Sequence, residues 1–378
     1  MYTRLLKAPD YKSFFLFGPR GTGKTTWVKK SYPAAVYLDL LESELFNSLL
    51  ANPQRLENYI PKDFSDFVII DEIQKVPKLL NEVHRLIENN RTKFILTGSS
   101  PRKLRKKGEN LLGGRALTHY MYPLTAVELG EDFDLAKSVN FGQLPSAYLD
   151  VDPKKYLEGY VKTYLEEEIS QEGLTRNLSA FARFLETASF SQGSVLNTSE
   201  VSRDATIERK VTESYFKILE DLLVGYRVPV FSKKAKRRLV SHPKFYFFDA
   251  GVYKAVRPMG PLDEPEVAQG VAFESLFFQD LLATNQSLDL GYKIYYYRTS
   301  MGQEVDFVLY GEKGIKAFEV KRTANPDSSD IKSLRLFLEE YPEAKGTLIY
   351  GGNRRMHIEN IDIIPMEEAL KTLPDLLA

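Results

Sequence analysis

The sequence of 378 residues contains no cysteine and only 4 histidines. The lack of cysteine excludes disulfides, thiolate zinc sites and cysteine nucleophiles, and so few histidines argue against histidine-based metal centres. Any catalysis is therefore expected to depend on carboxylates, lysines and hydroxyls.

The chain also lacks an excess of charge, because Lys+Arg and Asp+Glu both total 51. No global field then attracts nucleic acid or a membrane, and such attraction would have to come from local patches. No apolar run approaches the length of a membrane span, and no charged and then apolar leader follows Met1. We therefore expect a cytoplasmic protein without a membrane partner. Since 43% of the residues are hydrophobic, the chain can form the cores of two or three globular domains.

A phosphate-binding loop pattern, GPRGTGKT, follows the apolar run 13–17 near the start of the chain. Glycines let the backbone curl around phosphates at a helix start, Lys24 would reach the β- and γ-phosphates, and the Thr25 hydroxyl would bind Mg²⁺. The pattern predicts ATP and Mg²⁺ as cofactors; the alternative is a chance glycine-rich turn. The predicted nucleotide contacts are Gly18, Pro19, Arg20, Gly21, Thr22, Gly23, Lys24, Thr25 and Thr26.

Four apolar runs, at 13–17, 35–39, 67–70 and 93–97, alternate with helical patterns and predict a parallel sheet covered on both faces. Asp71 and Glu72 follow the third run, at the strand end that would face the phosphate loop. Asp71 is then a candidate Mg²⁺ ligand, and Glu72 is a candidate general base for the attacking water. The plainer interpretation is that this acidic pair caps the next helix.

The fourth run ends in small polar residues, of which Ser99 is a candidate sensor of the γ-phosphate. With the GPRGTGKT loop, FVIIDEIQ at 67–74, LTGSS at 96–100 and LGGR at 112–115, this part of the chain resembles the AAA-type ATPases, in the bacterial and archaeal branch with an uncharacterised C-terminal region. The resemblance places Arg115 where such ATPases often carry an arginine that completes a neighbour's site, which implies a homo-oligomer. An ion pair between Arg115 and a structural carboxylate is the alternative.

The middle of the chain predicts a helical connector around 156–165, three helices at 178–192, 198–203 and 208–223, and a hairpin from 226–229 and 244–248. Short helices before a β-ribbon are typical of a winged helix-turn-helix. The hairpin tip carries five cations that would contact phosphates of DNA or RNA without reading sequence, although such modules also dock proteins. These candidate nucleic-acid contacts are Lys233, Lys234, Lys236, Arg237 and Arg238.

The C-terminal part predicts an amphipathic helix opening at 273–278 and strands at 293–298, 304–309 and 317–321. Glu319 and Lys321 project to one side of their strand and can face Asp306 on the next one. Two carboxylates would bind a divalent metal through Asp306 and Glu319, and the lysine could position a water. The arrangement resembles the PD-(D/E)xK nucleases, which implies that Glu274 is a further catalytic acid; Val305 stands where proline is common. An inactive scaffold with an ion-paired Glu319 and Lys321 is the alternative.

The sequence thus predicts an α/β protein with a RecA-like parallel-sheet P-loop ATPase core at 1–135, a helical connector at 136–177, a winged-helix module at 178–262 and a restriction-endonuclease-like α/β domain at 263–378. The expected function is Mg²⁺-dependent ATP hydrolysis coupled to nucleic-acid binding or processing. The alternative is a non-nucleolytic regulatory ATPase whose later domains dock a protein partner.

Overall fold

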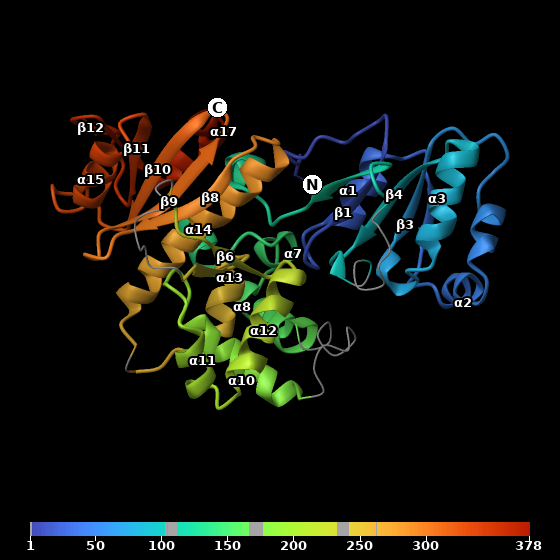
Figure 1. Cartoon of the computed structure of the whole chain (residues 1–378), viewed down its shortest axis with the longest axis horizontal. Coiled ribbons are helices and arrows are strands. Elements are labelled where there is room, and N and C mark those ends of the chain that lie inside the picture. Colours follow the sequence, from blue (N-terminus) through green and yellow to red (C-terminus); the bar gives the residue numbers. More distant parts are fainter. Residues whose placement is uncertain (1, 103, 105–111, 166–176, 233–241, 262) are drawn as a thin grey trace. The chain divides into compact units, whose positions relative to one another are not determined.

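The computed structural model describes residues 2–102, 104, 112–165, 177–232, 242–261 and 263–378 (Figure 1). They form two compact units. The smaller unit comprises Leu6–Tyr122 and Asp221–Leu223, and the larger unit comprises Met1–Leu5, Pro123–Glu220 and Val224–Ala378. The domain boundaries expected at 135, 177 and 262 remain predictions.

The smaller unit is built on a five-stranded parallel sheet in the order β2-β3-β4-β1-β5. The four predicted strands are present as β1 to β4, whereas β5 was not predicted because its residues are only partly buried and form no apolar run. The strands are β1 Ser13–Phe17, β2 Val36–Asp39, β3 Phe67–Asp71, β4 Lys93–Gly98 and β5 Ala116–Tyr120.

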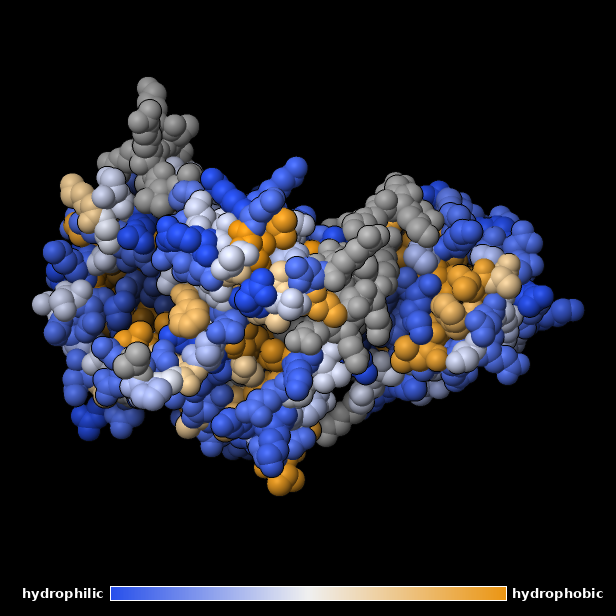
Figure 2. All heavy atoms as spheres, turned by 90° about the horizontal axis from the view of Figure 1, so that it is seen from below, coloured by the Kyte–Doolittle hydropathy of each residue, from blue (hydrophilic) through white to orange (hydrophobic). Residues whose placement is uncertain are grey.

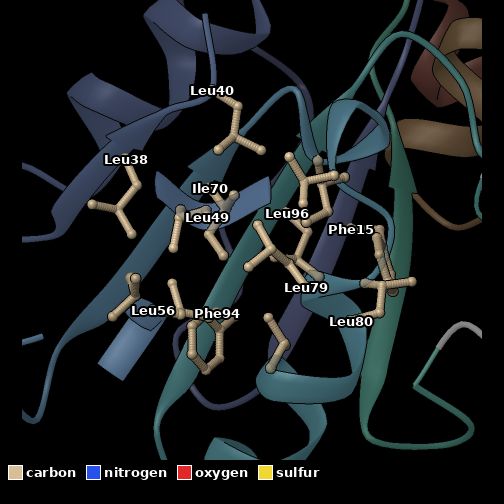
Figure 3. Close-up of a cluster of buried hydrophobic side chains, with 14 of the residues drawn as sticks. Phe15, Leu38, Leu40, Leu49, Leu56, Ile70, Leu79, Leu80, Phe94 and Leu96 are labelled. Atoms are coloured by element: carbon tan, nitrogen blue, oxygen red, sulfur yellow. The ribbon is translucent and has the colours of Figure 1, made fainter. Parts of the chain in front are cut away.

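Both faces of this sheet are covered, because alternate side chains of each strand enter different cores. Phe15 packs with residues of the second and third helices (Figure 3), and Phe17 belongs to the same core. Phe14 and Leu16 pack instead with Trp27 and Val28 of the first helix. This burial fixes the strand ends that carry the phosphate loop and Asp71. The helices are α1 Lys24–Ser31, α2 Ser43–Ala51, α3 Leu79–Asn90 and the short 3-10 turns η1 Pro53–Tyr59 and η2 Ile73–Lys75.

The larger unit begins with short helices and a two-stranded antiparallel ribbon, β6 Gly225–Val228 with β7 Lys244–Phe247. The predicted connector, three helices and hairpin are thus present as elements, while a winged-helix assignment remains a prediction. The helices are α5 Ala126–Leu129, η3 Gly130–Asp132, α6 Leu135–Phe141, α7 Pro145–Tyr148, α8 Pro153–Gly159, the π-helical η4 Tyr160–Leu165, α10 Leu178–Ser189, α11 Thr198–Asp204, α12 Arg209–Asp221 and α13 Ala250–Val256.

A mixed six-stranded sheet in the order β12-β13-β11-β10-β9-β8 completes the larger unit. The sequence analysis missed β11 to β13, which follow the last segment it assigned. Its strands are β8 Lys293–Arg298, β9 Glu304–Gly311, β10 Gly314–Lys321, β11 Ala344–Tyr350, β12 Met356–Ile358 and β13 Ile361–Pro365; its helices are α14 Pro265–Ser287, α15 Lys332–Glu340, α16 Met366–Lys371 and α17 Leu373–Leu377.

Helix α14 differs from the prediction in two ways. It begins at Pro265, a favoured first helical position, rather than at Phe273. From Ala272 to Asn285 almost every residue is buried, including Gln279 and Asp280, so the helix is not amphipathic there. Two of its buried polar side chains accept hydrogen bonds inside the unit: Gln279 Oε1 accepts from Ala250 N at 3.0 Å, and Asp280 Oδ2 accepts from Ala126 N at 2.8 Å.

Among the described residues, no helix combines the length and apolar content needed to cross a bilayer. Figure 2 shows hydrophilic residues over most of the face in view, with apolar residues in scattered patches between them.

Candidate functional site

The phosphate loop connects β1 to α1 in the smaller unit. Gly21 and Gly23 adopt positive φ angles of 82° and 90°, a conformation that favours glycine. Gly18 also cannot carry a side chain, because a Cβ there would lie 2.2 Å from the backbone oxygen of Met121. Three glycines of the motif are therefore required by the backbone itself.

Lys24 folds back over this loop. Its Nζ donates to the backbone oxygens of Gly18 at 2.6 Å and Pro19 at 3.0 Å, and the side chain is buried. The Thr22 hydroxyl donates to the same Pro19 oxygen at 2.8 Å. Since carbonyls are neutral partners, a phosphate oxygen can replace them as acceptors of the ammonium with a gain in charge attraction.

Asp71, at the end of β3, gathers hydroxyl groups from three other segments. Its Oδ2 accepts from Thr25 Oγ1 at 2.8 Å and from the Tyr37 hydroxyl, and its Oδ1 accepts from the Thr97 hydroxyl. The two predicted Mg²⁺ ligands, Thr25 and Asp71, thus lie in direct contact. Carboxylate and hydroxyl oxygens are the ligands that Mg²⁺ prefers, so this pair fits the ion that the motif implies.

Glu72 lies beside the loop, in a left-handed backbone conformation with φ of 60°. Gln74 donates from Nε2 to the Glu72 carboxylate and, at 3.3 Å, to the hydroxyl of the predicted sensor Ser99. Burial raises the pKa of Glu72, and the charge of Lys24 opposes that rise. A carboxylate with a raised pKa is a stronger base toward water.

Two residues of this site, Tyr37 and Gln74, have no functional role in the sequence analysis, although both lie in segments that it names. Tyr37 lies in the middle of an apolar strand, where its ring predicts only packing. Gln74 follows Glu72 by two positions, and the buried Oε1 of its amide accepts no hydrogen bond within the described part of the chain.

The remaining predicted loop residues surround this core. Arg20, Thr25 and Thr26 are exposed, and Pro19 is buried. The charge of Arg20 acts on Glu72 in the direction that lowers its pKa.

Arg115 lies at the end of the parallel strands opposite to the phosphate loop. It immediately precedes β5, whose first residue pairs with Ser13 at the start of β1, while the phosphate loop follows the end of β1. A strand rises about 3.3 Å per residue, so the four steps along β1 separate its two ends by about 13 Å. Arg115 forms an ion pair with Glu88, lowers the pKa of that carboxyl, and donates to Gly113 O at 3.3 Å.

The larger unit brings Asp306, Glu319, Lys321 and Glu274 together. Strands β9 and β10 pair antiparallel with Phe307 opposite Phe318, which puts Asp306 next to Glu319. Val320 N donates to Asp306 Oδ2 at 3.0 Å, and Asp306 N donates to Glu319 Oε2 at 3.4 Å. Lys321 Nζ lies 2.6 Å from Glu319 Oε1, the ion pair named as the alternative above.

Lys244 of β7, which the sequence analysis places in the hairpin without a role, lies among these acids. Its Nζ lies 2.6 Å from Glu304 Oε1, 3.0 Å from Asp306 Oδ1 and 3.4 Å from Glu274 Oε1, and its side chain is 1% exposed. The Tyr246 hydroxyl also donates to Glu274 at 2.5 Å. We call Lys244, Glu274, Glu304, Asp306, Glu319 and Lys321 the carboxylate cluster.

The pKa values in the carboxylate cluster diverge. Burial, reinforced by the neighbouring Asp306, raises the pKa of Glu274 to about 7 and that of Glu319 to about 8. Burial would also raise the pKa of Asp306, but the charges of Lys244 and Lys321 outweigh it and lower that pKa. Asp306 is therefore held in its ionised form beside Lys244.

The predicted nucleic-acid contacts Lys233, Lys234, Lys236, Arg237 and Arg238 lie outside the described residues.

Residues 10–130 match the family model described as an AAA domain, so the chain carries an AAA domain in its N-terminal part. Residues 132–263 and 269–369 match two further models, each described as a domain of unknown function (DUF8612 and DUF4143).

Uncharacterized protein Rv2008c of Mycobacterium tuberculosis is 26% identical over 370 residues, covering 94% of this chain and 80% of its own length. An uncharacterized protein of Haemophilus influenzae is 23% identical over 247 residues, covering 60% of each chain.

Two solved structures have low similarity. The Aeropyrum pernix ORC1 protein in complex with DNA has a TM-score of 0.28 and 14% identity, covering 66% of this chain and 87% of its own. A signal transduction ATPase (STAND) protein of Pyrococcus horikoshii has a TM-score of 0.22 and 14% identity, covering 77% and 49%. Similarity at this level supports no conclusion about this chain.

Proposed function

We propose that the smaller unit hydrolyses ATP with Mg²⁺. The observation that carries this proposal is the contact of Thr25 with Asp71 beside a phosphate loop over which the buried Lys24 side chain folds back. The AAA domain at residues 10–130 supports the same conclusion.

Each residue has a role in the reaction. Lys24 neutralises charge on the β- and γ-phosphates, and Thr25 and Asp71 would hold Mg²⁺, which shields the phosphate oxygens when bound. Glu72 takes a proton from the attacking water as the new bond to the γ-phosphorus forms and the bond to the β-phosphate oxygen breaks. Ser99, joined to Glu72 through Gln74, would respond when the γ-phosphate leaves.

The test is ATP turnover by the purified full chain and by Lys24→Ala, with Lys30→Ala on the exposed surface of α1 as the matched control. Lys24→Ala should reduce turnover by about 10²-fold or more, because it removes a fixed charge from the transferring phosphoryl group. Lys30→Ala should retain turnover. Full activity in Lys24→Ala would refute the site assignment.

We further propose that Arg115 acts on a neighbouring copy of the chain, since it lies at the end of the strands opposite to its own phosphate loop. Turnover per molecule should then rise with protein concentration, and Arg115→Ala should abolish that rise. The exposed ion pair to Glu88 would have to open in the assembly. Turnover independent of concentration would contradict this role.

For the larger unit we propose the non-nucleolytic role, in which it binds a nucleic-acid or protein partner without cleaving phosphodiesters. The observation that favours it is Lys244 within the carboxylate cluster. Plasmid and single-stranded DNA should stay intact with Mg²⁺ or Mn²⁺, with and without ATP. Cleavage that disappears in Asp306→Ala would refute this role and leave ATP hydrolysis untouched.

A further inference from the structure

The acids of the carboxylate cluster have the composition of a divalent-metal centre, but the two candidate metal ligands, Asp306 and Glu319, already accept hydrogen bonds from the chain at every carboxylate oxygen. Asp306 Oδ1 accepts from Lys244 Nζ and Oδ2 accepts from Val320 N. Glu319 Oε1 accepts from Lys321 Nζ and Oε2 accepts from Asp306 N. A hard cation needs several oxygens to converge on it, and here each of these four oxygens already accepts one hydrogen bond, in two cases from a lysine ammonium.

Lys244 reaches this position because its backbone is held on both sides. On one side it pairs with Val228 of β6, and on the other it forms a bridge to Val195. The neighbouring Phe245 also accepts from Gly193 N at 2.8 Å. Strand pairing on both sides of Lys244 therefore fixes its backbone in the position from which the ammonium contacts the acids.

The surroundings of Lys244 keep it charged. Its Nζ lies within 3.4 Å of carboxylate oxygens of three acids, Glu304, Asp306 and Glu274. The ring of Tyr296 also lies 5.8 Å from Nζ. A second cation bound to the same carboxylate oxygens would be repelled by this fixed charge. Consistent with this, the described residues contain no group of three or more His, Asp or Glu arranged to hold a metal ion.

We infer that the carboxylate cluster carries its own cation: the Lys244 ammonium takes the position that a divalent metal would need, excludes that metal, and ties β7 to α14 and β9. This inference deepens the non-nucleolytic role proposed above and is independent of ATP hydrolysis. The metal implied by the resemblance to nucleases does not fit the site as the chain builds it.

The experiment measures Mn²⁺ binding by electron paramagnetic resonance. The protein is the nucleotide-free full chain carrying Lys24→Ala, so that Mn²⁺ does not bind at the phosphate loop together with a triphosphate. We expect this parent, the Lys24→Ala chain, to have no Mn²⁺ site at Asp306, so adding Asp306→Asn should not change its Mn²⁺ binding. Adding Lys244→Ala removes the ammonium and should create one, with an affinity gain of about tenfold or more. That new site should disappear in the Lys244→Ala, Asp306→Asn chain.

Lys316→Ala is the matched control, because Lys316 is a second buried lysine of the same unit that donates instead to the oxygens of Leu376 and Ala378. It should create no Mn²⁺ site. If Lys244→Ala does not fold, as judged by circular dichroism, Lys244→Gln replaces it.

Two results would overturn the inference: a Mn²⁺ site in the parent that Asp306→Asn removes, or a folded Lys244 variant that gains none. Mn²⁺ bound in the parent without DNA cleavage would overturn the inference alone. Binding together with Asp306-dependent cleavage would also overturn the non-nucleolytic role.

Discussion

Asp71 in the smaller unit and Asp306 in the larger unit are both buried aspartates in strands, but the donors that contact them differ in charge. Asp71 accepts from the hydroxyls of Thr25, Tyr37 and Thr97, whereas Asp306 accepts from the Lys244 ammonium. Hydroxyls can turn and share a carboxylate with an incoming cation, but a fixed ammonium cannot. The comparison teaches that the partners of an acidic residue, more than the acid itself, decide whether a metal can bind.

The largest expected effect tests the chemistry around Asp71. Glu72→Gln removes the proton acceptor and should lower kcat for ATP by about 10²–10⁴-fold while nucleotide binding persists. Turnover assays and calorimetric titration with ATP separate the two effects. Glu82→Gln on α3 is the control and should leave turnover unchanged. Similar turnover in Glu72→Gln and wild type would exclude Glu72 as the base.

The next prediction compares the two aspartates directly. Asp306→Asn removes one of the three carboxylates around the buried Lys244 ammonium and should destabilise the larger unit by about 3 kcal/mol. Asp71→Asn exchanges one acceptor among neutral hydroxyls and should cost about 1 kcal/mol, although it should abolish ATP turnover. Hydrogen exchange measured on peptides spanning 304–321 and 67–71 reports each unit separately. Equal protection losses would show that the two sites do not differ in the way proposed.

The smaller unit could be predicted further than the larger one because its motif is contiguous. Glycines, Lys24 and Thr25 are adjacent in sequence, and four apolar runs placed Asp71 and Glu72 at the same edge. Strand β5 was missed because it is only partly buried. Tyr37 was missed because a tyrosine within a strand predicts packing, and only the register of β2 against β3 brings its hydroxyl to Asp71.

The carboxylate cluster was predictable only in part. Alternation along two adjacent strands put Glu319 and Lys321 beside Asp306, but Lys244 is 62 positions earlier, on a ribbon assigned to another module. The one available signal was a lysine opening the apolar run KFYFF, where a buried cation requires acidic partners. The sequence could not say which acids those would be.

The pH dependence of stability sharpens the comparison further. The pKa values of Glu274, about 7, and Glu319, about 8, lie above the ordinary value of 4.5, so the folded larger unit binds protons more tightly than the unfolded chain. Its stability should therefore fall as the pH rises from about 5 to 8. Asp306 has a lowered pKa and acts in the opposite direction, but only under more acidic conditions.

Chemical denaturation across this range, followed by hydrogen exchange at β10, measures the slope for the larger unit. Glu319→Gln should flatten it, because that variant has no proton to exchange at this position. The exposed Glu339→Gln on α15 should leave the slope as it is. A stability that rises between pH 5 and 8 and is insensitive to Glu319→Gln would contradict the raised pKa of that carboxyl.

The smallest expected effect concerns the hydroxyl that orients Asp71. Tyr37→Phe removes one of three hydroxyl donors, and Thr25 and Thr97 keep the carboxylate in place, so kcat/KM for ATP should fall only about fivefold, equivalent to about 1 kcal/mol. Tyr32→Phe is the matched control, because its hydroxyl donates at 2.5 Å to Pro9 O. Both variants lose one hydrogen bond of the same unit, but only Tyr37→Phe should alter the Mg²⁺ dependence of turnover. Equal losses in the two would mean that the Tyr37 hydroxyl acts through stability alone, and that Thr25 and Thr97 suffice to hold Asp71 ready for the ion.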